Sequence, residues 1–357
     1  ACAARFMVAA SMRTTSTHLT NSGSQHSAGT ARMRAVTQVE YGSSEILELV
    51  TIDRPTIGDD EVLIEVRAAG LDRGVWHLAT GLPYLARLMG YGFRKPKQPV
   101  PGLDVSGVVA EVGRDVTRFA VGDEVFGIGT GTFAQFAAAK ESKLVHKPAN
   151  VTFEQAGVAT ISGITALQAL TTAGRLTSGQ HVLVIGASGG VGSFAVQLAK
   201  ALGATVTGVA STAKLDAVRA LGADRVIDYT ERSIDDGTQR YDLIIDTGGA
   251  NRLSRLRRAL TPTGTLVIVG AETGGRITGG IGRQVRAMML SPLVGQRLGA
   301  MFSHETLENI ESLAEHLASG AVTPEVGQRF ELDQVPDAFV AMEEGRLVGK
   351  AAINVSA

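Results

Sequence analysis

The chain has 357 residues, of which 44% are hydrophobic and 19% charged, with a formal net charge of -1. This balance suits a soluble protein of about two domains and shows no footprint of nucleic-acid or anionic-membrane binding. The only cysteine is Cys2, which excludes an internal disulfide and a cysteine-based zinc site. No apolar run reaches the ~18 residues of a membrane-spanning helix.

Residues 1–32 differ in composition from the rest of the chain. They are rich in Ser and Thr, contain Arg5, Arg13 and Arg32, and include no acidic residue. This composition resembles an organelle transit peptide. The alternatives, which we favour, are an upstream translation start or residues added by cloning, with Met33 as the natural start and a cytoplasmic location. In each case we expect an unordered extension, because it has little periodic apolar surface.

Residues 33–157 are expected to form a mostly β first domain. Short apolar runs alternate with Gly, Pro and Asp, which is the pattern of strands separated by turns. An irregular stretch over 71–93, with a short helix near Trp76, interrupts them. The predicted strands cover 34–39, 46–52, 61–69, 108–112 and 133–138, and 122–127 is expected to be a hairpin or a turn that leads into a strand.

The pattern changes near residue 153, where a helix over Phe153–Ala173 is predicted. Strands and helices then alternate, which indicates an α/β fold class with a parallel sheet and right-handed crossovers. We expect this second domain to cover 158–318, and the tail over 319–357 to return to the first domain as strand-like pieces. The predicted strands are 181–186, 205–210, 224–228, 241–246, 264–270 and 297–302, followed by a helix over 307–318.

A glycine-rich turn over 186–192 is the most informative motif. It follows an apolar run and opens a helix-like run, which is the order of a dinucleotide-binding unit. Glycine lets the backbone approach a diphosphate, whose charge is met by N–H groups at the helix start. The alternative is a turn that only packs helix on strand. The predicted cofactor contacts are Gly186, Ser188, Gly189, Gly190, Val191 and Gly192.

The end of the next strand indicates which dinucleotide binds. A ribose 2′-hydroxyl is commonly held by an Asp or Glu about 20 residues after the first glycine, but no acid stands there. Ser211, Thr212 and Lys214 instead suit a 2′-phosphate, which predicts NADPH rather than NADH. The alternative role of Ser211 and Thr212 is to cap the following helix.

From about Met33 to Val355 the chain resembles the zinc-free quinone oxidoreductase branch of the medium-chain dehydrogenase/reductase superfamily. The resemblance rests on the signatures at 102–113, 122–127, 186–192 and Gly349-Lys350. It implies a GroES-like first domain, a Rossmann domain with a doubly wound parallel sheet, and a homodimer. It also implies cofactor contacts from Thr165, Tyr229, Thr247, Gly270 and Lys350.

The resemblance also predicts that no metal is bound. Zinc-dependent relatives use a Cys in the first domain and a His beside a Glu, and these places hold Asp72 and Leu103-Asp104. Asp72 also departs from the zinc-free branch, which often has an Asn there that orients the substrate. Asp72 is therefore expected either to accept a hydrogen bond or to be held by Arg73.

Four side chains are candidates for orienting a substrate or supplying a proton. His77 is a plausible proton donor, or a partly buried structural histidine. The phenol of Tyr84 either donates or packs on a loop. Thr165 matches a position near the nicotinamide, or is a helix hydroxyl bonded to its own backbone. Asp72 completes the set.

These features predict an NADPH-dependent reductase of quinones or α,β-unsaturated carbonyls. The cofactor supplies the hydride, while the protein positions the acceptor and excludes water. The partner is a small molecule in the cleft between the domains, with no nucleic acid and no integral membrane segment. The alternatives are a zinc-free reductase of aldehydes or ketones and a non-catalytic NADPH-binding adaptor.

Overall fold

A computed structural model describes residues 31–87, 92–270 and 275–355. The first strand, β1 (Arg32–Thr37), already contains Arg32, so the predicted unordered extension is one residue too long. The remainder of that prediction, over 1–30, lies outside the described residues. No helix in the described part of the chain is long and apolar enough to cross a membrane.

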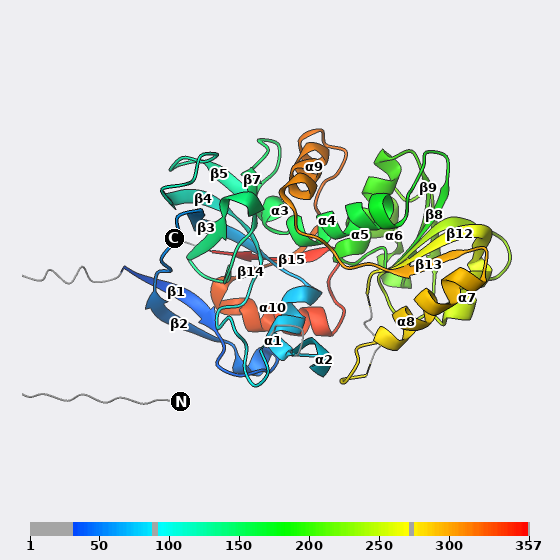
Figure 1. Cartoon of the computed structure of the whole chain (residues 1–357), viewed down its shortest axis with the longest axis horizontal. Coiled ribbons are helices and arrows are strands. Elements are labelled where there is room, and N and C mark those ends of the chain that lie inside the picture. Colours follow the sequence, from blue (N-terminus) through cyan, green and yellow to red (C-terminus); the bar gives the residue numbers. More distant parts are fainter. Residues whose placement is uncertain (1–30, 88–91, 271–274, 356–357) are drawn as a thin grey trace, which may run out of the picture. The chain divides into compact units, whose positions relative to one another are not determined.

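The first sheet joins strands from the N-terminal part of the chain with the last two strands. Its order is β14-β15-β3-β4-β5-β7, with β6 pairing β3 (Figure 1). Because β15 is antiparallel to β3, with Ala351 opposite Leu71, the start of β15 lies beside the end of β3. A separate ribbon pairs β1 with β2 (Glu48–Asp53). The strands are β3 (Glu61–Leu71), β4 (Asp104–Val112), β5 (Glu124–Ile128), β6 (Phe136–Lys140), β7 (Leu144–His146), β14 (Val326–Glu331) and β15 (Lys350–Asn354).

The second sheet has six parallel strands in the order β10-β9-β8-β11-β12-β13. The chain winds from β8 first in one direction and then in the other, so the strand order reverses between β8 and β11. Ligands of such sheets bind at the carboxyl ends of the strands beside this reversal. The arrangement confirms the predicted α/β fold class. The strands are β8 (His181–Ile185), β9 (Thr205–Ala210), β10 (Arg225–Asp228), β11 (Tyr241–Asp246), β12 (Leu260–Ile268) and β13 (Arg297–Ala300).

Alternate residues of β8 face two different cores. Val182 and Val184 pack in a cluster with Phe194 of α5. Leu183 packs in another cluster, with Leu256 of α7. Both faces of the parallel sheet are therefore covered, which explains why its strands read as continuous apolar runs. The helices around it are α4 (Thr160–Gln168), α5 (Gly190–Ala201), α6 (Leu215–Ala220), α7 (Leu253–Ala259), α8 (Ile281–Leu290) and α9 (Leu307–Ala318).

The long helix predicted over Phe153–Ala173 is wrong as a single element. It is divided into α3 (Phe153–Gly157), α4 and a π-helical turn over Ala169–Ala173. The break follows Gly157, whose backbone lies so close to β3 that an added Cβ would be 2.8 Å from the Ala68 carbonyl oxygen. Contact with the first sheet therefore interrupts a pattern that the sequence reads as one helix.

Two further elements differ from prediction. The tail contains a helix, α10 (Val335–Glu343), where only strand-like pieces were expected. Its buried residues Val335, Ala338 and Phe339 have helical spacing and join the core of the first sheet. Between β10 and β11 there is no helix, because Asp236 accepts the backbone N–H of Thr238 and its hydroxyl in a turn.

Candidate cofactor and substrate site

The turn between β8 and α5 has the backbone geometry that its glycines suggest. Gly186 has φ +79°, in the left-handed region that favours glycine. A Cβ on Gly192 would lie 2.0 Å from the Gly186 carbonyl oxygen, so this position requires glycine for close packing. At Gly189 the nearest atom to an added Cβ is 3.4 Å away. Gly189, beside the start of α5, therefore has more room around it than Gly192 does.

Ser188, Gly190 and Val191 complete this turn. Ser188 is buried, and its carbonyl oxygen accepts the Gly349 N–H at 2.8 Å. Gly190 is the first residue of α5, and Val191 follows it, partly buried against the core. The turn is thus tied to the C-terminal segment that leads into β15.

Thr247 and Gly270 lie next to this turn at the carboxyl ends of β11 and β12. The Thr247 hydroxyl donates to the Ile185 carbonyl at 2.8 Å. A Cβ on Gly270 would lie 2.3 Å from the Thr247 carbonyl oxygen. Thr247 therefore lies at the reversal of strand order and Gly270 packs against it, and the Thr247 hydroxyl proton is already used within the fold.

The four candidates for the 2′-phosphate lie at the ends of β9 and β10. Ser211 and Thr212 follow β9, and the Thr212 hydroxyl lies 3.3 Å from that of Thr230. Lys214 donates to the carbonyl oxygens of Gly345 and Leu347, each at 2.7 Å, and burial lowers the pKa of its ammonium. Tyr229 is 62% exposed. The Lys214 contacts with the C-terminal segment have no signal in the sequence.

Sequence reasoning missed Asp228, a buried acid at the end of β10. One oxygen of its carboxylate accepts the backbone N–H of Thr230 at 2.9 Å and its hydroxyl at 2.6 Å. Hydrogen bonds from Thr212 and then Thr230 lower the pKa of Asp228. Asp228 therefore fixes Thr230, whose hydroxyl lies 3.3 Å from that of Thr212. It lies on the neighbouring strand, outside the region after β9 in which an acid was sought.

Asp72 and Lys350 belong to one buried ion cluster. Asp72 is the N-cap of α1 (Arg73–Thr80), and its Oδ1 accepts the Val75 N–H at 3.0 Å. Its Oδ2 lies 3.1 Å from the ammonium of Lys350, which also binds Asp104. The prediction that Asp72 accepts a hydrogen bond is confirmed, and the cation that holds it is Lys350, which the sequence analysis did not consider. The pairing follows from the neighbouring ends of β3, β4 and β15, which a single sequence does not reveal.

The electrostatics of this cluster follow from its burial and unequal charges. Asp104 is 0% and Lys350 2% exposed. Burial raises the pKa of Asp104 to about 6 against the attraction of Lys350, and Asp72 adds to the rise. Burial alone would lower the pKa of the Lys350 ammonium. The attraction of the carboxylates of Asp104 and Asp72 outweighs this effect, so the pKa of Lys350 is raised. Two acids share one ammonium, so the cluster has an excess negative charge when both are ionised.

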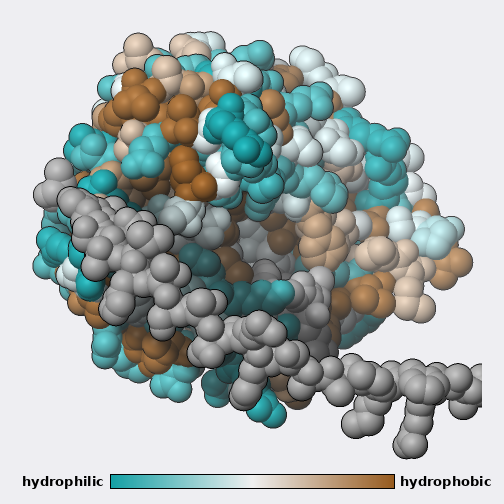
Figure 2. Space-filling model, turned by 60° about the vertical axis from the view of Figure 1, so that its left-hand side comes forward, coloured by the Kyte–Doolittle hydropathy of each residue, from teal (hydrophilic) through white to brown (hydrophobic). Residues whose placement is uncertain are grey.

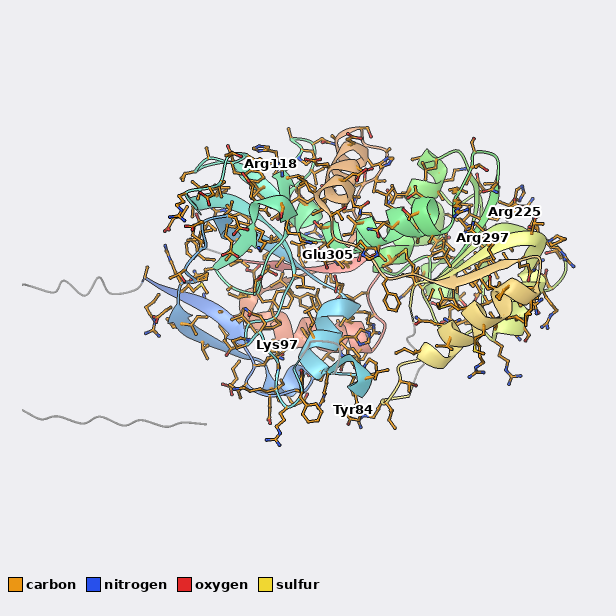
Figure 3. The ribbon with its side chains drawn as sticks, viewed as in Figure 1. Tyr84, Lys97, Arg118, Arg225, Arg297 and Glu305 are labelled. Atoms are coloured by element: carbon orange, nitrogen blue, oxygen red, sulfur yellow. The ribbon has the colours of Figure 1, made fainter. Side chains whose placement is uncertain are left out.

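The candidates on and after α1 already have partners. The Nδ1 of His77 lies 2.7 Å from the Leu82 carbonyl, and the tautomer that donates there leaves Nε2 to exchange a proton. Tyr84 belongs to α2 (Tyr84–Ala86), is 43% exposed, and carries Arg87 over its ring. Its backbone N–H donates to the Arg276 carbonyl at 2.8 Å, in the loop that precedes α8 (Figure 3).

Thr165 lies in α4 and is partly buried. Its hydroxyl donates to the Ile161 carbonyl at 2.6 Å, one helical turn earlier. This is the bond to its own backbone that the sequence left open as the alternative. The hydroxyl oxygen can still accept a hydrogen bond, but its proton is committed to the helix.

The cluster of Asp72, Asp104 and Lys350 does not have the composition of a zinc site. No group of three or more His, Cys, Asp or Glu side chains that could hold a metal lies together within 31–87, 92–270 and 275–355. The two carboxylates of Asp72 and Asp104 are already bound to a lysine ammonium, which a metal would have to displace.

The molecular face in Figure 2 is hollowed near its centre, with hydrophilic and hydrophobic surface at the rim.

Comparisons with known proteins agree with this architecture. Residues 58–149 match the alcohol dehydrogenase GroES-like domain family and 221–353 the zinc-binding dehydrogenase family. The chain is 32% identical to a 2-methylene-furan-3-one reductase of Solanum lycopersicum over 340 residues, 91% of this chain and 79% of that protein. It is 32% identical to an NADPH-dependent alkenal/one oxidoreductase of Arabidopsis thaliana over 350 residues, 90% and 79% respectively. The quinone oxidoreductase structure from Coxiella burnetii superposes with TM-score 0.80 at 27% identity, covering 91% of this chain and 100% of that one.

Proposed function

The chain belongs to the quinone oxidoreductase-like branch of the medium-chain dehydrogenase/reductase superfamily, and we propose that it is an NADPH-dependent reductase of quinones or α,β-unsaturated carbonyls that works without a metal. The observation that carries the proposal is the glycine turn. Gly186 adopts a backbone that favours glycine, Gly192 has no room for a side chain, and Gly189 is open. The names of the relatives, an enone reductase and a quinone oxidoreductase, support the acceptor classes.

In this proposal the turn holds the diphosphate through backbone N–H groups at the start of α5. Lys214, with Ser211, Thr212 and Tyr229 beside it, holds the 2′-phosphate, which requires the Lys214 ammonium to turn from the carbonyls of Gly345 and Leu347. NADPH supplies the hydride when bound. Thr247 and Gly270 line the site where the strand order reverses.

The chain's own residues then have to place the acceptor and deliver a proton. Reduction leaves negative charge on the acceptor oxygen, which a nearby donor stabilises. His77 is the best of the four candidates, because its Nδ1 is fixed on the Leu82 carbonyl and Nε2 can exchange a proton. The committed hydroxyl proton of Thr165 and the paired carboxylate of Asp72 make both weaker donors.

NADPH oxidation measured against a panel of quinones, enones and aldehydes tests this function. An enone separates the alternatives, because a saturated ketone as product indicates enone reduction and an alcohol indicates carbonyl reduction. Cofactor binding with no turnover of any acceptor would favour the non-catalytic adaptor.

Metal independence is tested separately. Two carboxylates held by an ammonium are a poor zinc site, since zinc sites in proteins rely on Cys, His and carboxylate ligands in tetrahedral sets. Purified protein is expected to contain no stoichiometric zinc and to keep its activity in chelators. Zinc that is lost together with activity would overturn this part of the proposal.

We also propose a homodimer formed through the edge of the parallel sheet. β13 is an edge strand, whose open hydrogen-bonding groups can pair with a second copy. Nearby on α8 and just after it, four large apolar side chains are exposed: Val285 46%, Met288 58%, Met289 69% and Leu293 79%. Light scattering should give twice the chain mass, and Met289→Lys should shift the equilibrium to monomer.

A further inference from the structure

Lys350 joins three elements that the proposed reaction needs in a fixed arrangement. We propose that Lys350 is a positioning residue, whose buried ammonium couples the glycine turn to the starts of α1 and α4, so that cofactor binding stabilises the substrate-side helix α1. Cofactor binding itself is taken from the proposed function. The coupling is an additional claim about Lys350, which the resemblance had suggested as a cofactor contact.

The backbone before Lys350 is attached to the glycine turn. The Gly349 N–H donates to the Ser188 carbonyl at 2.8 Å, and Gly349 pairs with Gly189 in a parallel bridge. The side chain of Lys350 then passes the first residue of α5, because a Cβ on Gly190 would lie 3.0 Å from its Cγ. A displacement of the turn is therefore transmitted directly to Lys350.

The ammonium end of Lys350 is attached to two helix starts. Asp72 caps α1 through the Val75 N–H at 3.0 Å and binds the ammonium at 3.1 Å. Asp104 binds the same ammonium and accepts the Ile161 N–H, in the first turn of α4, at 2.8 Å. Each carboxylate therefore uses one oxygen for a helix start and the other for Lys350.

The burial of this cluster makes the coupling strong. Lys350, Asp104 and Asp72 are 2%, 0% and 9% exposed. Removing the ammonium leaves two buried carboxylates without their counter-charge, which costs several times more than the loss of an exposed pair. With both ends of Lys350 occupied inside the fold, its effect on the cofactor passes through the turn rather than through a direct contact.

Hydrogen exchange with and without NADPH tests the coupling without relying on catalysis. In the wild type, NADPH should slow hydrogen exchange at the amides of the glycine turn. Through Lys350, it should also slow exchange at the amides of α1, by roughly tenfold. In Lys350→Met, which keeps the length of the stem and removes the charge, protection at the turn should remain and protection at α1 should be lost. The control is Lys147→Met, since the Lys147 side chain is also only 6% exposed and pairs with the half-exposed Glu124 at 3.0 Å, away from the turn.

The outcomes separate the claims. Protection of α1 that persists in Lys350→Met, or is absent in the wild type while the turn is protected, would overturn the coupling. No protection at the turn in the wild type would instead count against NADPH binding and so against the proposed function. If Lys350→Met does not fold, Lys350→Met combined with Asp104→Asn removes one unpaired carboxylate, and the same loss of α1 protection is expected. A direct cofactor contact of Lys350 would instead weaken protection at the turn and at α1 equally.

Discussion

The glycine turn and the helix α1 differ in how their chemistry is built. The turn is built from backbone groups. Gly186, Gly189 and Gly192 matter because a side chain at any of them would strain the backbone, clash with it or fill the space beside it. The helix α1 and its N-cap work through side chains, and Asp72 and His77 are each already bonded within the fold. A backbone site is visible in the sequence as glycine spacing, whereas the state of a side-chain site depends on partners that are distant in sequence.

Two glycine substitutions should separate binding from folding within the turn. Gly189→Val adds a side chain whose Cβ makes only an ordinary contact, 3.4 Å from the Gly186 carbonyl oxygen, so the fold should tolerate it. Because the side chain blocks the proposed diphosphate position, NADPH affinity should fall by at least about a hundredfold, or ~2.7 kcal/mol. Gly192→Ala places a Cβ against the Gly186 carbonyl oxygen and should lower the melting temperature as well. Fluorescence titration and thermal melts measure the two effects. Full NADPH affinity in Gly189→Val would mean that the turn is only structural.

Lys214→Ala tests the side-chain part of the cofactor site. Loss of a charge-assisted hydrogen bond is worth roughly 1.5–3 kcal/mol, so NADPH should bind about ten- to a hundredfold more weakly. NADH lacks the 2′-phosphate and serves as the control, with affinity nearly unchanged. An equal loss for both cofactors would show that Lys214 acts by holding Gly345 and Leu347, the alternative that its contacts suggest.

The same contrast explains how much could be predicted from the sequence. The parallel sheet followed from apolar runs that alternate with helices, and the order of strands confirmed the fold class. The cluster of Asp72, Asp104 and Lys350 could not be predicted, because Lys350 is 278 residues from Asp72 and 246 residues from Asp104 in the sequence. The helix α10 was missed because its apolar residues also suited short strands. Periodicity records which face is buried, but not which charges meet there.

Asp104→Asn tests the buried cluster through the pH dependence of stability. Burial raises the pKa of Asp104 to about 6, from about 3.9 in the unfolded chain. The folded state therefore holds the extra proton between these values, and the contribution of this carboxyl to stability falls as pH rises from about 4 to about 6. Above that range its contribution is constant.

The measurement is the difference in melting temperature between wild type and Asp104→Asn from pH 4 to pH 8. The wild type should lose stability relative to the variant up to about pH 6, after which the difference should level off. A difference that rises with pH would mean that Lys350 outweighs burial and that the pKa of Asp104 is lowered. Asp60→Asn is a matched control, because its ion pair with Lys140 is exposed.

Asp72→Asn should have the smallest effect and bears most directly on whether α1 acts through charge. Asn keeps the size of the side chain and can still cap α1 through the Val75 N–H. The substitution removes the excess negative charge of a cluster in which two carboxylates share one ammonium, and Asp104 remains to balance Lys350. Turnover of a quinone is therefore expected to be preserved or raised by no more than about threefold, which corresponds to less than ~1 kcal/mol, with NADPH affinity unchanged. Asp72→Ala is the informative comparison, since it also removes the cap and should lower stability by ~1 kcal/mol. The contrary outcome is that Asp72→Asn loses most of its turnover while Asp72→Ala melts like the wild type. The carboxylate of Asp72 would then be a reacting group rather than a helix cap. At this residue, the distinction between a turn built from backbone and a helix positioned by buried charges would fail.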